Sequence, residues 1–174
     1  MLRALVPSDA PELARLLNDR SISATTLAIP FPYTRKDAVE WIGRQDMDRK
    51  QGKTFNLAIT LRADGRLAGG VGLSSVSAEH SRAELGYWVA KEFWARGYCT
   101  EACRALLSYA FRTLGLQRVY ASHFPNNPAS GRVMEKLGMK REGYLRRHVR
   151  RRGRYVDLVC YGVLASDLRA RKDR

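Results

Sequence analysis

The chain has 174 residues, of which 45% are hydrophobic and 28% charged, which is typical of a soluble globular protein with one buried core. No apolar run approaches the length of a membrane span, and the N-terminus lacks the apolar core of a signal peptide. We therefore expect a single cytoplasmic domain over residues 1–174 with no membrane partner. The formal net charge of +14 predicts an acidic partner, such as RNA, a ribosome surface or an anionic cofactor, or else a solvated basic face.

The first fifty residues predict one strand and two helices. Leu2–Val6 is typical of a strand, and Ser8 is a plausible N-cap for a helix whose apolar stripe is Leu13, Leu16 and Leu17. From Ile22 to Tyr33 we expect an irregular loop that packs under its neighbours or lines a substrate pocket, because it contains Pro30 and Pro32. Thr34 and Asp37 form a capping box for the next helix, whose inward positions are predicted to be Ala38, Val39, Ile42 and Met47.

A hairpin follows. The strands Phe55–Leu61 and Leu67–Val76 flank the turn signal Asp64-Gly65. Gly70-Val71-Gly72 begins like a dinucleotide-binding motif, but no helix follows it, so we reject that interpretation. Glycines within a strand indicate a bulge or a close approach of another chain segment.

The central segment runs from Ala83 to Leu116 and predicts a strand, a turn and a helix. In the strand Ala83–Ala90, alternation places Leu85, Tyr87 and Val89 on one face and Glu84, Gly86 and Trp88 on the other. An amphipathic helix begins near Tyr98–Thr100 and ends before Gly115, a predicted left-handed C-cap. A helix that starts after a glycine turn presents free N–H groups, so Ala95–Thr100 predicts either an anion cradle or an ordinary turn.

The remaining elements complete a crossover and a second hairpin. Arg118–Phe124 predicts a strand parallel to the one before the central helix. Asn127 is a strong N-cap with Pro128 at the first helical position, and Ser130 follows in the first turn. Lys140–Val149 and Tyr155–Leu164 predict an antiparallel pair with its turn at Arg152-Gly153. Two helices thus begin at the carboxyl ends of parallel strands, where open sheets bind ligands.

Metal chemistry is not expected. The three cysteines give an odd count, and Cys99 and Cys103 have no further Cys or His nearby to complete a ligand set. His123 lies near the predicted cleft, and a hydrogen-bonded structural role is the better hypothesis for it than catalysis.

Two segments together resemble the GNAT N-acetyltransferase superfamily, namely F-W-A-R-G-Y-C-T-E-A at 93–102 and N-N-P-A-S-G-R-V-M-E-K-L-G-M at 126–139. The chain looks most like the branch that acetylates the N-terminal alanine or serine of ribosomal proteins, and the resemblance in element order covers nearly the whole chain. It implies a three-layer α/β fold. The central sheet would be mixed but mostly antiparallel, with about seven strands, one splayed parallel pair and helices on both faces. It also implies a homodimer, which is common in this branch.

The resemblance further implies acetyl-CoA as co-substrate, with its pyrophosphate held by the loop 94–99. Gly97 matches the family pattern, whereas Cys99 replaces the usual Gly or Ala and Trp94 the usual Gln or Arg. Both departures fall where backbone contacts dominate, so we expect binding to survive. The implied cofactor-binding residues lie on the strand, the loop and the second helix: Trp88, Val89, Arg96, Gly97, Tyr98, Cys99, Thr100, Asn127 and Arg132.

For catalysis the resemblance implies direct attack of a primary amine on the thioester. Glu84 is the candidate base, acting through water, or alternatively a strand residue paired with an arginine. Ser130 is the candidate donor to the leaving thiolate, or alternatively a capping residue, and Tyr144 is the runner-up. The segment 146–151 lacks the carboxylate that some members of this branch carry there.

The acceptor amine stays open at this point. It is a protein N-terminus such as that of a ribosomal protein, or a small amine such as a polyamine, an antibiotic or an amino acid. Two alternatives without catalysis are an acyl-CoA-binding sensor and a basic nucleic-acid-binding module, although no recognised nucleic-acid motif is present.

Overall fold

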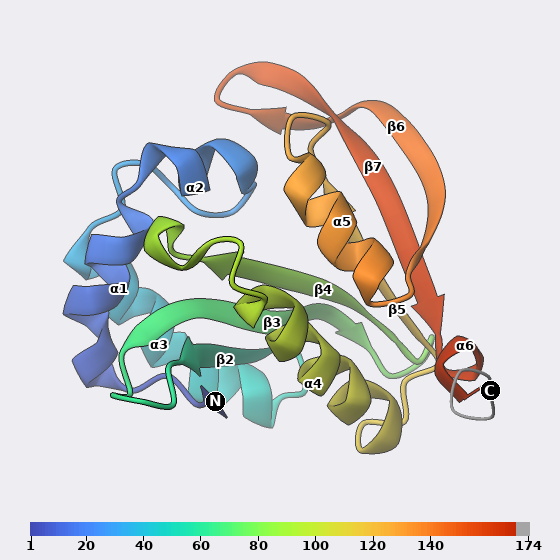
Figure 1. The fold of residues 1–174 in the computed structure, drawn as a ribbon, viewed down its shortest axis with the longest axis horizontal. Coiled ribbons are helices and arrows are strands. Elements are labelled where there is room, and N and C mark those ends of the chain that lie inside the picture. The colour runs from blue at the N-terminus through green and yellow to red at the C-terminus, as the bar shows by residue number, and fades with distance from the viewer. Residues whose placement is uncertain (170–174) are drawn as a thin grey trace.

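The computed structural model describes residues 1–169 of the 174. A seven-stranded mixed sheet forms its centre, with the strand order β1-β2-β3-β4-β5-β7-β6 (Figure 1). The strands are β1 (Leu2–Arg3), β2 (Phe55–Thr60), β3 (Leu67–Ser77), β4 (Arg82–Val89), β5 (Arg118–His123), β6 (Lys140–Arg151) and β7 (Arg154–Leu164). The helices are α1 (Ala10–Leu17), α2 (Arg20–Thr25), α3 (Arg35–Lys50), α4 (Tyr98–Arg112), α5 (Pro128–Lys136) and α6 (Ala165–Arg169), with 3₁₀ turns at Pro7–Asp9 and Lys91–Phe93.

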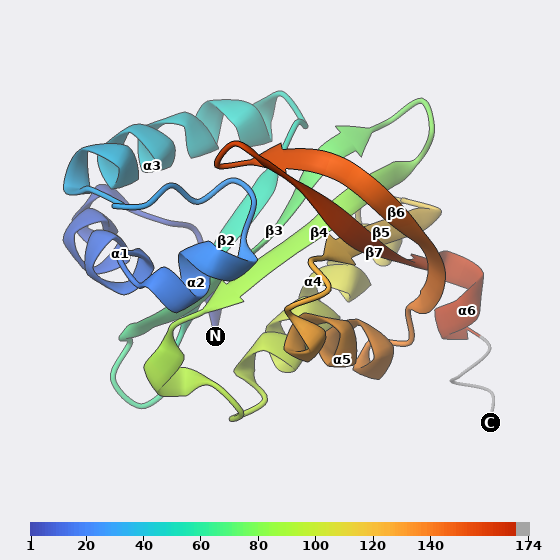
Figure 2. The ribbon, with the colours of Figure 1, turned by 90° about the horizontal axis from the view of Figure 1, so that it is seen from above.

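The predicted three-layer architecture is confirmed. Figure 2 shows α1 and α3 on one face of the sheet and α4 and α5 on the opposite face. The buried side of α4 is formed by Ala102, Cys103, Leu106, Leu107 and Ala110, so this helix is amphipathic as predicted. Within residues 1–169, no helix combines the length and apolarity needed to cross a bilayer.

One parallel pair of strands positions the site. β4 pairs with β5 in parallel, whereas the other neighbouring strands pair antiparallel. The β4–β5 ladder covers Arg82–Glu84 and Arg118–Tyr120 only. β4 continues to Val89, so its last five residues have a ladder partner on the β3 side and none on the β5 side. This divergence is the predicted splayed pair.

Local sequence signals account for the helix starts that flank this gap. The Thr34 side chain accepts from the Asp37 N–H while Asp37 accepts from Thr34, which is the predicted capping box of α3. Asn127 Oδ1 accepts from the Ser130 N–H at 3.3 Å, and Pro128 occupies the first helical position of α5. Gly97 before α4 is left-handed, with φ +82°.

The glycines of β3 allow close packing, as predicted. A Cβ added at Gly70 would lie 2.5 Å from Trp88 Nε1, and one added at Gly72 would overlap the Asn56 side-chain amide. The indole of Trp88 therefore lies across the backbone of β3, on the side of β4 that also carries Glu84.

Three local predictions were wrong, two of them before α3 and one within α3. Ser8 lies inside a 3₁₀ turn and does not cap α1, because the N-cap position is occupied by Asp9. The Asp9 carboxylate accepts from the Val6 N–H and pairs with Arg3. The predicted loop from Ile22 to Tyr33 begins with the end of helix α2, which Asp19 caps by accepting from the Ser21 N–H at 2.7 Å. The prolines lie beyond α2, so they limit its length without preventing it.

The inward face of α3 is narrower than predicted. Ala38 and Ile42 are buried, whereas Val39 and Met47 are 52% and 59% exposed. Met47 follows Ala38 by nine residues, and at about 100° per residue this places it on the opposite side of the helix.

Candidate active site

A large cavity occupies the gap where β4 leaves β5. Its volume is about 1570 Å³, and it is lined from the starts of α4 and α5 through β4 to the end of the β6–β7 hairpin. It includes ten of the eleven residues predicted for the site: Glu84, Trp88, Val89, Gly97, Tyr98, Cys99, Thr100, Asn127, Ser130 and Arg132. Arg96 is the exception, because its side chain is exposed and its guanidinium lies 5.8 Å from the centre of the Phe93 ring.

The start of α4 offers a set of backbone donors. Glu101 is the first residue of this turn whose N–H is satisfied, by the Gly97 carbonyl at 3.0 Å. The N–H groups of Gly97, Tyr98, Cys99 and Thr100 donate to no acceptor within residues 1–169. Together with the helix dipole, four such donors can hold an anion without a basic side chain.

Trp94 has a defined structural part in this turn. Its indole Nε1–H donates to the Val89 carbonyl at 2.7 Å, which ties the loop before α4 to the end of β4. A Gln or Arg at this position would supply a flexible polar side chain, whereas the rigid indole of Trp94 holds the loop before α4 against the end of β4. The departure from the family motif thus leaves the backbone donors at Gly97 and beyond accessible to an anion.

Glu84 is the last residue of β4 that pairs with β5, and it is half-buried. Its carboxylate makes no hydrogen bond or ion pair with any residue of the described chain, so the alternative of a pairing with an arginine is not realised. Burial raises the pKa of Glu84 above its ordinary value. A partly desolvated carboxylate that faces a cavity is a stronger proton acceptor than a surface one.

Ser130 and Tyr87 form a pair that the sequence did not reveal. Tyr87 Oη lies 2.9 Å from Ser130 Oγ and donates to the Ser130 carbonyl at 3.0 Å. Burial raises the pKa of Tyr87, so the phenol stays protonated. The Ser130 hydroxyl is therefore oriented by Tyr87, while Asn127 does the capping. The alternation of β4, which turns Tyr87 toward the helix face, was the only signal for this contact.

Of the two other residues considered for catalysis, Tyr144 lies outside the cavity and His123 lines it. Tyr144 is 45% exposed, does not line the cavity, and donates to Asp157 Oδ2 at 2.6 Å. The structure therefore does not bring the runner-up donor to the cavity. His123 is buried with Nδ1 2.8 Å from the Phe124 carbonyl oxygen and its ring against Tyr161, in agreement with the structural role predicted for it.

The cavity as a whole is not acidic. The carboxylates that line the cavity are Glu84 and Glu142, and Glu142 forms a bidentate pair with Arg118, at 2.7 Å between Oε1 and Nη1. Arg82, Arg132 and Lys136 line it as well. Positive charge thus exceeds negative charge around the cavity.

Comparison with known proteins identifies the family. The model of the acetyltransferase (GNAT) domain matches residues 1–140. The Bacillus subtilis protein named "Putative ribosomal N-acetyltransferase YdaF" is 33% identical over 98% of this chain and 94% of its own. The chain belongs to the GNAT acetyltransferase family.

Solved structures of GNAT enzymes agree with this assignment. A spermidine N-acetyltransferase from Vibrio cholerae, solved with CoA and spermine, is 25% identical with a TM-score of 0.81, covering 96% of each chain. The ribosomal-protein-S5-alanine acetyltransferase of Vibrio fischeri shares the fold with a TM-score of 0.86 at 19% identity, covering 95% of this chain and 93% of its own. The protein is an acetyl-CoA-dependent N-acetyltransferase, and the unpaired edge of β4 and the free donors of α4 suit this co-substrate.

Proposed function

We propose that this N-acetyltransferase acts on the N-terminal α-amine of a protein, and that the acceptor is a ribosomal protein. The observation that carries the proposal is the charge of the cavity: its one unpaired carboxylate is Glu84, and the surrounding ionisable side chains are mostly cationic. A single ammonium group can be received at Glu84, whereas an amine with several positive charges meets repulsion from Arg82 and its neighbours. The relative from Bacillus subtilis, whose name includes ribosomal N-acetyltransferase, supports the same acceptor class.

In this proposal both backbone groups and side chains bind acetyl-CoA. The free N–H groups from Gly97 to Thr100 bind the pyrophosphate of acetyl-CoA, and the unpaired edge of β4 at Trp88 and Val89 receives the pantetheine. Asn127 holds the first turn of α5 so that Ser130 faces the cavity, and Arg132 adds positive charge on the same helix. Arg96, which lies outside the lining, contributes only through long-range attraction.

Glu84 then removes the proton from the incoming amine. An α-ammonium has a pKa of about 8, so about one tenth of it is neutral at pH 7. A carboxylate that is reached directly or through one water shifts this balance and leaves the nitrogen lone pair free to attack the thioester carbonyl.

Ser130 assists the departure of the thiolate leaving group. The carbon–sulfur bond breaks as the amide forms, and the electron pair goes to a thiolate, whose pKa is about 8.5 by analogy with cysteine. The Ser130 hydroxyl donates a hydrogen bond to this thiolate, and Tyr87 Oη, 2.9 Å from Ser130 Oγ, can in turn donate a hydrogen bond to Ser130. The proton that the nitrogen loses on amide formation finally converts the thiolate to the free thiol of CoA. Neither hydroxyl needs to ionise in the resting enzyme, in keeping with the raised pKa of Tyr87.

A polyamine is the second candidate acceptor, because the Vibrio cholerae spermidine N-acetyltransferase shares the fold at 25% identity. Cavity charge argues against it. The deciding experiment follows thiol release from acetyl-CoA with peptides that begin with Ala or Ser, with spermidine and with free amino acids, and identifies products by mass spectrometry. We expect the peptides to have the highest kcat/KM. A kcat/KM for spermidine ten-fold above that of every peptide would overturn the proposal.

A further inference from the structure

The β6–β7 hairpin concentrates the positive charge of the protein. Residues 140–154 contain seven arginines and one lysine against the single acid Glu142, which amounts to half of the formal excess of +14. β6 is also the last strand of the sheet, so one of its edges faces solvent. A dense basic segment on an exposed edge strand is the electrostatic footprint of a polyanion-binding surface.

Only part of this charge is used inside the protein. Arg151 donates to the Thr26 carbonyl at 3.0 Å and to the Ser23 carbonyl, and Arg152 donates to Ser23 Oγ, so both tie the tip of the hairpin to the α2 region. Lys140 pairs with Asp167 at 2.8 Å. The guanidinium groups of Arg146 and Arg150 form no ion pair within residues 1–169, and neither does that of Arg147.

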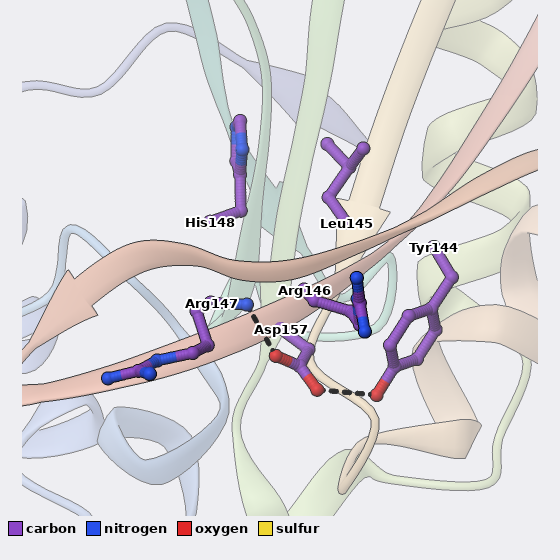
Figure 3. A pocket seen from close by; sticks show the side chains of 6 residues that line it. All are labelled: Tyr144, Leu145, Arg146, Arg147, His148 and Asp157. Atoms are coloured by element: carbon purple, nitrogen blue, oxygen red, sulfur yellow. Dashed lines mark hydrogen bonds between the residues drawn. The ribbon is translucent and has the colours of Figure 1, made fainter.

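A bulge turns these groups outward. Leu145 pairs with Leu158 and Val149 with Val156, so three residues of β6 lie opposite Asp157 alone. Arg147 is left-handed at φ +49°, and its N–H donates to Asp157 Oδ1 at 2.6 Å. Figure 3 shows Arg146 and Arg147 on the side of the strand that carries Asp157 and Tyr144, whereas Leu145 and His148 point to the other side.

Asp157 supplies only one negative charge to this surface. One of its oxygens accepts from the Arg147 N–H and the other from Tyr144 Oη at 2.6 Å. These hydrogen bonds, that of Arg147 first, hold the pKa of Asp157 below its ordinary value. One ionised carboxylate thus lies among several exposed arginines, so an excess of positive charge remains that a bound polyanion can neutralise.

Aromatic rings lie among the arginines. The Arg147 guanidinium lies 5.1 Å from the centre of the Tyr155 ring, and Tyr155 is 57% exposed. Arg150 lies directly opposite Tyr155 in the β6–β7 ladder, so the two share a face. We name Tyr144, Arg146, Arg147, Arg150 and Tyr155 the hairpin face. It borders a hollow of about 560 Å³ lined by Tyr144, Leu145, Arg146, Arg147, His148 and Asp157.

We propose that the hairpin face binds a strand of RNA. Arginine suits this partner better than lysine does, because its planar fork contacts phosphate with two parallel hydrogen bonds and stacks on bases. Exposed tyrosines beside arginines provide stacking platforms for unpaired bases, which neither an acidic peptide nor a lipid headgroup would use. The choice of RNA over DNA rests on the proposed function, since a ribosomal acceptor lies on RNA.

The hairpin face lies close to the cavity. Leu145 and His148 line the cavity from the opposite side of β6, so RNA on the hairpin face would lie one strand away from the cavity. RNA held there raises the local concentration of an acceptor bound to the same RNA.

The test compares two triple variants of the full chain. Arg146→Gln, Arg147→Gln and Arg150→Gln alter the hairpin face. Arg35→Gln, Arg44→Gln and Arg62→Gln remove the same charge from exposed positions elsewhere. Binding of a labelled 20-nucleotide polyuridine RNA is followed by fluorescence anisotropy from low to high salt, with a DNA strand of the same length and phosphatidylserine vesicles as further arms.

For three phosphate contacts the parent should show a log–log salt slope near −2, at about 0.7 per contact. The hairpin variant should lose that slope and bind roughly 100-fold more weakly at about 0.1 M salt. The control variant should stay within about three-fold of the parent. Equal weakening in both variants, tighter binding of the DNA or of the vesicles, or no RNA binding by the parent would overturn the proposal.

Peptide acetylation without RNA separates this proposal from the function proposed above. We expect the hairpin variant to acetylate the N-terminal Ala peptide like the parent, because none of its three substituted side chains lines the cavity. Loss of RNA binding with intact acetylation supports the hairpin face. RNA binding that depends on the hairpin face, in a protein that acetylates no peptide, contradicts the acceptor and leaves the RNA site standing.

Discussion

Replacement of Glu84 by Gln tests the proposed chemistry most directly. The amide keeps the shape of the side chain but cannot take a proton from the incoming ammonium. At pH 7 we expect kcat/KM for an N-terminal Ala peptide to fall about 100-fold, the lower end of the range for general base catalysis, because a water carries the proton. This equals about 2.7 kcal/mol of transition-state stabilisation. At pH 9 most of the α-amine is already neutral, so the deficit should shrink to about ten-fold or less.

The same substitution should stabilise the fold at neutral pH. The pKa of Glu84 is raised in the folded protein by burial, so its carboxylate is costlier to hold there than in the unfolded chain. Its contribution to stability is fully present below the unfolded pKa and is lost as the pH rises through the folded pKa. The variant should therefore unfold at a higher temperature than the parent at pH 7, with no difference below the ordinary carboxyl range.

Thiol release from acetyl-CoA measures the first effect, and thermal unfolding monitored by circular dichroism measures the second. Glu79→Gln is the matched control, because the Glu79 side chain is 85% exposed in the turn between β3 and β4. It should change neither quantity. Activity within two-fold of the parent would refute a proton-acceptor role for Glu84. A deficit that stays constant from pH 7 to pH 9 would refute ammonium deprotonation as its task.

Two further predictions concern the helix starts at the cavity. In Gly97→Ala the added Cβ meets no atom within 4 Å, but the residue must keep φ at +82°. This left-handed backbone costs an alanine about 1 kcal/mol, which the loop cannot release while CoA is bound. Isothermal titration should therefore show CoA binding weakened by about five-fold. Gly115→Ala is the control, since Gly115 has φ +67° beyond the other end of α4. It should lower the free energy of unfolding by as much as Gly97→Ala does but leave the Kd for CoA unchanged. Equal weakening of CoA binding in the two variants would contradict a role of Gly97 in binding. Asn127→Ala should lower the free energy of unfolding by about 1 kcal/mol in urea titrations, whereas Asn127→Ser should retain most of it, and equal losses would exclude capping as the cause.

Local signals in the sequence determined most of the fold. The capping box at Thr34, the Asn127-Pro128 start of α5 and the left-handed Gly97 act within four residues, so their geometry follows from the chain itself. Alternation along β4 likewise separates Glu84 from Tyr87. The errors arose where local signals competed. Two prolines suggested an irregular segment from Ile22, although Asp19 starts a helix ahead of them.

Only the tertiary structure decided which distant side chains meet. Tyr87 and Ser130 are 43 residues apart, and their contact depends on how α5 packs beside β4. The outward turn of Arg146 and Arg147 depends on the register of β6 against β7, which is interrupted where three residues of β6 lie opposite Asp157 alone. Periodicity specifies which face a residue occupies, because backbone geometry repeats along one element. The distance between two faces is set by packing between elements, and no single segment contains that information.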